Sequence, residues 1–148
     1  MTIPSLDALP LALSGHVGYL MVRLGKRAQR LFSIQIEPLG LRPPHCDILF
    51  TLQERGALSQ VEIANTLAIE RAHLVALLDQ LTTMGLLARS VDPTDRRRHA
   101  VNLTPEGLVL TTRLAKIALE VEDTLLAELD QADRESLRAL LRQLAVSP

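Results

Sequence analysis

Two short amphipathic segments joined by three residues constrain the fold of this chain more than any other feature of its sequence. The first begins at Ser59-Gln-Val-Glu62, a capping box in which the Ser59 hydroxyl accepts a backbone N–H while Glu62 reaches back to the cap. The second covers residues 71–84. The expected inward residues are Val61, Ala64 and Leu67 in the first segment and Leu74, Leu77, Leu78 and Leu81 in the second. Because the connection is so short, the pair is predicted to form a helix-turn-helix.

A β-hairpin is predicted directly after the second helix. Gly85 suits the left-handed position that ends a helix, and residues 86–91 form a short apolar run. Turn residues follow at 92–95, and residues 99–103 then alternate, with Val101 and Leu103 on one face. A hairpin in this position is the wing of a winged helix-turn-helix.

Helical segments flank this region on both sides. A shorter helix starts at Pro43, closes at Gly56 and is expected to bury Ile48, Leu49 and Leu52. Thr104 is expected to cap a long helix with Pro105 in its first turn, and a last helix follows Asp130. Apolar residues recur at helical spacing near the start of the chain, at Leu13, Val17, Leu20, Met21, Leu24, Ala28 and Leu31, and after Thr104, at Leu110, Leu114, Ala118, Val121 and Leu125. In the last helix the expected inward residues are Leu137, Leu140, Leu141 and Leu144.

These long apolar faces are larger than one small domain can cover, so they predict dimerisation through both chain ends. The expected fold class is mainly α with a small β-hairpin wing: a winged helix-turn-helix with long N- and C-terminal dimerisation helices. We assign residues 1–37 to the N-terminal dimerisation helix, 38–104 to the winged helix-turn-helix, and 105–148 to the C-terminal dimerisation helices. The 148 residues suffice for one such intertwined domain per subunit.

The distribution of charge is more informative than its sum. The chain has 16 Lys and Arg against 17 Asp and Glu. A basic stripe of Arg23, Lys26, Arg27 and Arg30 is expected to face water, and residues 120–135 are mostly acidic and expected to be solvated or to pair with that stripe. The turn of the hairpin holds Arg96, Arg97 and Arg98 in a row. Three adjacent guanidinium groups repel one another, which favours a negatively charged partner for this turn.

Composition excludes several classes of protein. A single cysteine, Cys46, excludes an intramolecular disulfide framework and fits a reducing interior. The start of the chain does not resemble a signal peptide and no apolar run is long enough for a membrane span, so we expect a cytoplasmic protein. No glycine-rich phosphate loop, no nucleophile with a neighbouring base and no metal-ligand spacing occurs, so we expect neither an enzyme nor a cofactor or metal site.

Five stretches occur in a specific order: Leu39-Gly-Leu-Arg-Pro-Pro-His-Cys-Asp-Ile-Leu49, Leu58-Ser-Gln-Val-Glu-Ile-Ala64, Leu81-Thr-Thr-Met-Gly-Leu86, Asp92-Pro-Thr-Asp-Arg-Arg97 and Leu103-Thr-Pro-Glu-Gly107. Together they resemble the MarR (multiple antibiotic resistance) family of winged-helix transcription regulators, closely over residues 38–110. The resemblance implies a homodimer that binds a pseudo-palindromic operator in double-stranded DNA. It also implies that many members leave DNA when a small anionic, often phenolic, compound binds, and that a minority sense oxidants through a cysteine.

The start of the second short helix departs from the family pattern. Relatives usually have Asp or Ser where this chain has Glu70, a poor N-cap, and a basic residue near Ala76. Arg71, His73 and Gln80 are the polar residues left there for reading bases. The predicted DNA contacts are Ser59, Gln60, Arg71, His73, Arg96, Arg97 and Arg98, with Asp95 bracing Arg97. The alternatives are a solubilising loop at the wing and an exposed His73 without a ligand.

The resemblance also indicates where an effector would bind. His16, Tyr19 and His45 could line such a crevice, or could equally be partly buried polar residues at the dimer junction. Cys46 has apolar neighbours and is expected to be a buried, inert thiol rather than a redox sensor.

The predicted function is a DNA-binding repressor released by a small anionic or aromatic ligand. One alternative is a cysteine-based redox-sensing repressor of the same fold. A second, from a different class, is a winged-helix module for protein interaction without operator recognition, against which the three wing arginines argue.

Overall fold

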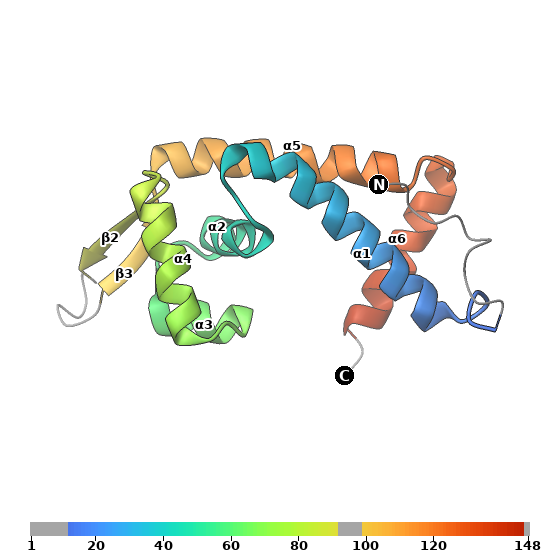
Figure 1. Ribbon diagram of the computed structural model, residues 1–148, viewed down its shortest axis with the longest axis horizontal. Coiled ribbons are helices and arrows are strands. Elements are labelled where there is room, and N and C mark those ends of the chain that lie inside the picture. The colour runs from blue at the N-terminus through green and yellow to red at the C-terminus, as the bar shows by residue number, and fades with distance from the viewer. Residues whose placement is uncertain (1–11, 92–98, 147–148) are drawn as a thin grey trace. The chain divides into compact units, whose positions relative to one another are not determined.

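The computed structural model describes residues 12–91 and 99–146 and divides the chain into two units (Figure 1). The winged unit is Leu31–Ala118, and the terminal unit combines the residues up to Arg30 with those from Leu119 onward. The winged unit contains the region predicted as the winged helix-turn-helix. Among the described residues, no helix has both the length and the apolar character needed to cross a membrane.

The winged unit contains three short helices and a small sheet, besides parts of two longer helices. The helices are α2 (Pro43–Arg55), α3 (Gln60–Leu67) and α4 (Arg71–Thr83), and the strands are β1 (Leu58–Ser59), β2 (Leu87–Val91) and β3 (His99–Leu103). The sheet is antiparallel in the order β1-β3-β2. This arrangement confirms the predicted helix-turn-helix and the hairpin after it.

Three further helices complete the described chain. They are α1 (Val17–Ile36), followed by the 3-10 turn η2 (Glu37–Leu39), then α5 (Pro105–Leu125) and α6 (Gln131–Val146). Helices α1 and α5 each contribute residues to both units, whereas α6 belongs to the terminal unit. The predicted starts after Thr104 and Asp130 are confirmed.

The core of the winged unit is aliphatic. Leu74, Leu77, Leu78 and Leu81 of α4 are fully buried, as predicted from their helical spacing. The predicted inward residues of α2, Ile48, Leu49 and Leu52, are also buried. Burying each such side chain contributes roughly 1.5–3 kcal/mol, so this cluster dominates the stability of the winged unit.

Helix α3 buries a different face from the predicted one. Ile63 is fully buried, whereas Val61 is 48% exposed and Ala64 and Leu67 are half-buried. The prediction of Val61 as an inward residue was wrong, because an eight-residue helix has too few turns for spacing alone to select its buried face. The packing of α3 against α4 and β3 selects Ile63 instead.

A hydrogen-bonded joint connects the end of α4 to the start of α5. Helix α4 ends in a Schellman motif, in which Leu86 N–H donates to Leu81 O and Gly85 N–H donates to Thr82 O. The Thr104 hydroxyl donates to Gly85 O at 2.7 Å and accepts from Gly107 N–H at 3.0 Å. Thr104 N–H donates to Leu86 O at 3.0 Å. Thr104 is therefore both the predicted cap of α5 and the residue that fastens α5 to α4.

The long helices bury only part of their apolar surface among the described residues. In α5 the buried side chains are those of Thr111, Leu114, Ile117 and Val121, whereas Ala118 is exposed and Leu110 and Leu125 are half-buried. Of the residues predicted to point inward in α6, Leu140, Leu141 and Leu144 are exposed, and so are Leu13, Val17, Met21 and Leu24 of the apolar series near the start of the chain. These apolar side chains stay exposed among the described residues of one chain, which agrees with the prediction that the apolar faces are larger than one small domain can cover.

Gly107 provides a test of the joint between α4 and α5. A Cβ added at Gly107 would lie 2.3 Å from the backbone oxygen of Leu86, which cannot move without breaking the bond from Thr104 N–H. We expect Gly107→Ala to lower the free energy of unfolding by about 1–3 kcal/mol in chemical denaturation, despite the better helix propensity of alanine. Gly25→Ala in α1 is the matched control, because its added Cβ meets no atom within 4 Å. Equal stability of the two variants would contradict the close contact.

Candidate nucleic-acid interface

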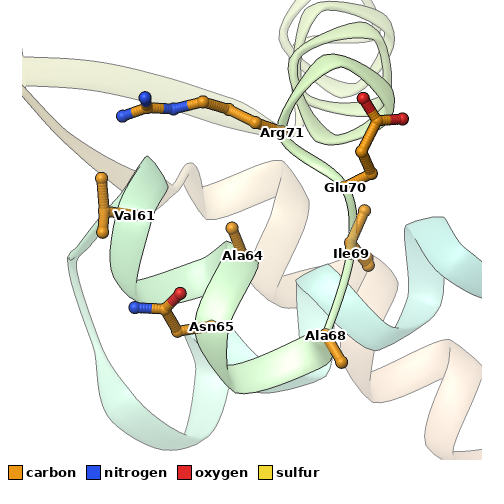
Figure 2. Close-up of a pocket in the computed structure, with 7 residues that line it drawn as sticks. All are labelled: Val61, Ala64, Asn65, Ala68, Ile69, Glu70 and Arg71. Carbon is orange, nitrogen blue, oxygen red and sulfur yellow. The ribbon is translucent and has the colours of Figure 1, made fainter.

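The outer surface of the helix-turn-helix contains an open cavity of about 600 Å³ (Figure 2). Its lining consists of Val61, Ala64, Asn65, Ala68, Ile69, Glu70 and Arg71. The side chains of Glu70 and Arg71 point in opposite directions from the turn, so the cation and the carboxylate stand on different sides of the hollow. The predicted DNA contact Arg71 therefore lies at the edge of a concave surface formed by α3 and the start of α4.

The turn that shapes this cavity is tight and locally strained. Ala68 adopts a left-handed conformation with φ of 51°, which costs a residue with a Cβ roughly 1–2 kcal/mol. Ile69 N–H donates to Ala64 O at 3.1 Å and closes the end of α3. Glu70 occupies the N-cap of α4 without a side-chain cap bond, as predicted for a glutamate. The first turn of α4 thus keeps backbone N–H groups without a side-chain cap, which favours an anionic partner at this end.

The start of α3 is held by the predicted capping box. Glu62 N–H donates to the Ser59 hydroxyl oxygen at 3.3 Å, while Glu62 Oε2 accepts from Ser59 N–H at 2.8 Å and from the hydroxyl at 2.7 Å. The hydroxyl of Ser59 is therefore engaged within the cap, and Gln60 beside it is half-buried. DNA contact by Ser59 and Gln60 stays a prediction.

The exposed side of α4 carries the other predicted contacts. Arg71, His73 and Gln80 are all exposed, and so are the small residues Ala72 and Ala76. Because alanine offers only methyl contact, the polar chemistry of this helix surface comes from its first turn and from Gln80. The structure thus brings Arg71 and His73 together on the first turn of one helix, as the sequence predicted.

An ion pair joins the wing to α4. Arg89 on β2 donates to Asp79 Oδ1 on α4 at 2.5 Å, and both side chains are partly exposed. A pair this exposed contributes about 0–1 kcal/mol to stability, so its main effect is on geometry. Sequence reasoning missed this pair, since neither residue has a local partner. The short connection between α4 and β2, which separates Asp79 from Arg89 by ten residues, could have indicated this ion pair.

The wing arginines lie beyond the described strands. Val91 and His99 form the last described pair of the hairpin. Asp95, Arg96, Arg97 and Arg98 lie outside the described residues. The bracing of Arg97 by Asp95 stays a prediction.

His45 is buried and makes a hydrogen bond through each ring nitrogen. Its ring is 2% exposed, with Nδ1 3.0 Å from Arg42 N and Nε2 2.8 Å from Gln80 Oε1. Burial, the nearby Arg42 and His73 lower the pKa of His45 below its ordinary value of 6.5, and the bond to Gln80 offsets part of that shift. These contacts favour the alternative in which His45 is a buried polar residue over the one in which it binds an effector.

The other two predicted effector residues belong to the terminal unit. His16 is exposed, and its carbonyl accepts from Leu20 N–H at the start of α1. Tyr19 is half-buried in the first turn of α1. Since His45 belongs to the winged unit, grouping the three residues in one crevice stays a prediction.

Cys46 is buried beside His45 at the start of α2. Its side chain is 2% exposed, and burial raises the pKa of the thiol to about 12, with a further contribution from Asp47. A thiol of this kind is protonated at neutral pH and is a poor nucleophile. Among the residues that the structure describes, no group of His, Cys, Asp and Glu side chains could hold a metal ion.

The acidic stretch of the terminal unit pairs with α6. Arg134 donates to Asp123 Oδ1 at 2.6 Å, and Arg138 forms an ion pair with Glu122. The prediction left open whether these acids are solvated or meet the basic stripe of α1. Two of these acids, Asp123 and Glu122, form ion pairs with arginines of α6.

The chain is similar to known transcription regulators. Residues 41–99 match the model of the MarR family. Over 141 residues, 93% of this chain and 82% of its relative, the chain is 32% identical to the HTH-type transcriptional regulator PecS of Dickeya dadantii. The structure of BpsR of Bordetella bronchiseptica, which concerns regulation of DNA binding by 6-hydroxynicotinic acid, is 30% identical with a TM-score of 0.75 and covers 95% of this chain and 100% of BpsR. The repressor CouR bound to a 23-mer DNA duplex is 34% identical with a TM-score of 0.77, over 91% of this chain and 96% of CouR.

The environment of Cys46 predicts an unreactive thiol. We expect the native chain to react with a disulfide reagent such as dithionitrobenzoate at least about a hundredfold more slowly than the same chain in denaturant, because only the exposed thiolate attacks. Absorbance of the released thionitrobenzoate at about pH 8 measures both rates. Stoichiometric modification of the native chain at the rate of the unfolded one would contradict the burial.

Proposed function

The chain belongs to the MarR family and is a DNA-binding transcription regulator, and we propose that it is a repressor released from its operator by a small anionic aromatic ligand. The observation that carries the proposal is the helix-turn-helix followed at once by a hairpin, with Arg71 and His73 exposed on the first turn of α4. In winged helix-turn-helix proteins this turn enters the major groove. The wing arginines Arg96, Arg97 and Arg98 then meet phosphates and the minor groove, where negative potential is concentrated.

We propose that the protein acts as a homodimer in the cytoplasm. The uncovered leucines of α6 and the exposed apolar residues of α1 support this assembly, because large apolar surfaces on a single chain mark interaction sites. A two-fold axis would present two helix-turn-helix units to a pseudo-palindromic operator.

The proposed effector is a small aromatic anion. The similarity to BpsR, whose structure concerns 6-hydroxynicotinic acid, supports this class of compound. Release by oxidation is less well supported, since Cys46 is buried with a raised pKa. We propose His16 and Tyr19 as effector contacts, while the two hydrogen bonds of His45 favour a structural role for that residue.

The first test is binding to duplex DNA selected from a random library. We expect a dimer with half-sites about 10–10.5 base pairs apart, and an affinity that falls about tenfold or more between roughly 50 and 200 mM salt. Light scattering and fluorescence anisotropy measure the two properties, and 6-hydroxynicotinic acid is the first ligand to add. A monomer with no preference for any duplex would favour the alternative, a protein-interaction module.

The second test compares two sets of arginines. We expect Arg97→Ala to weaken operator binding by about tenfold or more, because it removes a charged contact to DNA, whereas Arg23→Ala on the basic stripe changes it little. Asp95→Ala should also weaken binding, although it removes a negative charge near DNA, because Asp95 is proposed to aim Arg97. Tighter binding by Asp95→Ala would disprove the bracing.

A further inference from the structure

The ring of His45 links the start of α2 to α4. His45 is the third residue of α2, where a side chain can reach back to the N-cap residue. Its Nδ1 accepts from the backbone N–H of Arg42 at 3.0 Å, which fixes the ring proton on Nε2. Nε2–H therefore donates to Gln80 Oε1 at 2.8 Å. The two contacts leave His45 neutral with a single tautomer.

This bond fixes the orientation of the Gln80 side chain. The carboxamide oxygen of Gln80 faces His45 Nε2, and the guanidinium of Arg42 also lies 3.5 Å from that oxygen. With two donors on its oxygen, Gln80 must turn its NH₂ group away from α2. Gln80 is exposed on α4, so this NH₂ offers two N–H donors at the surface of the recognition helix.

Gln80 lies in the third turn of α4, seven residues after His73 and therefore on the same side of the helix. In helix-turn-helix proteins the N-terminal residues of this helix read base edges, and contacts farther along reach the backbone. Phosphate oxygens accept hydrogen bonds and glutamine side chains commonly donate to them. A fixed pair of amide donors at this place fits a phosphate.

We propose that His45 is a positioning residue for DNA binding, which holds the carboxamide oxygen of Gln80 so that its NH₂ group donates to a backbone phosphate of the operator. The inference rests on the proposed function and extends it to a residue that does not touch DNA.

The proposal predicts that operator affinity falls when His45 is protonated at low pH. Protonation places an N–H on Nδ1 opposite the Arg42 N–H, which breaks the cap and displaces the ring that holds Gln80. Among the described residues, Arg42 at the start of α2 and His73 on α4 are the charged or titratable groups that act on His45, and each disfavours its protonation. Because burial lowers the pKa of His45 below its ordinary value of 6.5, His45 is neutral at pH 7, and its contribution is lost only as the pH falls through that lowered pKa.

The test measures operator affinity by fluorescence anisotropy from about pH 8 to about pH 5.5. At about pH 8 we expect Gln80→Ala to bind both specific and random duplexes about three- to tenfold more weakly than the wild type, because it loses one hydrogen bond to a phosphate. His45→Gln keeps an acceptor for Arg42 N–H and a donor for Gln80, so its affinity should match that of the wild type at this pH.

On acidification the wild type should lose about three- to tenfold more affinity than His45→Gln, which does not titrate. In the Gln80→Ala background, His45→Gln should leave the pH profile unchanged. His73→Gln removes the histidine of α4 and controls for its titration: in this background the pH profiles with His45 and with His45→Gln should still differ. Circular dichroism checks that each variant stays folded at the lowest pH.

Parallel pH profiles of wild type and His45→Gln would overturn the proposal, as would tighter binding by the wild type in acid. If Gln80→Ala lost affinity only for duplexes that carry one particular base pair, Gln80 would read a base instead of contacting a phosphate, and the proposal would be wrong. The His45 tautomer, measured by long-range ¹H–¹⁵N NMR on the free protein, tests the proposal without DNA: a proton on Nδ1 would refute it. Wild-type protein that binds no duplex at about pH 8 would refute the proposed function instead.

Discussion

The hydroxyl of Thr104 is the point on which the geometry of the winged unit depends. It donates to Gly85 O, where α4 ends, and accepts from Gly107 N–H, where α5 begins. The hairpin between these two glycines is thereby closed at its base, where Leu87 pairs with Leu103. Farther along the wing, the pair of Arg89 and Asp79 fixes β2 against α4. These two contacts hold the described strands of the wing at a fixed angle to α4. A protein that contacts DNA through both its wing and this helix requires such a fixed geometry.

The elements that the sequence predicts correctly are those specified by neighbours in the chain. The capping box at Ser59, the Gly85 stop and the Thr104 cap each involve residues within about five positions. The leucine face of α4 is periodic over enough turns to be unambiguous. Such signals sufficed for the order of the helices and for the hairpin, whereas the family was indicated by the resemblance of five ordered stretches of sequence.

The features that the sequence did not predict are contacts between distant residues. The two-residue strand β1 has no period of its own and is defined by its pairing with β3. Ile63 is buried because of what packs on α3, and His45 is engaged by Gln80, 35 positions away. The spacing of Leu140 and Leu144 identified an apolar face, but both side chains are exposed among the described residues of this chain. Periodicity identifies an apolar face without identifying what covers it.

Acidic residues on a surface that binds phosphates require an explanation, because uncompensated carboxylates repel DNA. Glu62 is neutralised locally, since its carboxylate accepts from Ser59 and stands at the positive end of α3. Asp79 is paired with Arg89. Glu70 points away from Arg71 across the turn (Figure 2). These three carboxylates are therefore either compensated by a local partner or directed away from the cation of the first turn. A chain with a net charge of −1 can present a cationic surface to DNA where carboxylates such as Glu62 and Asp79 are compensated locally.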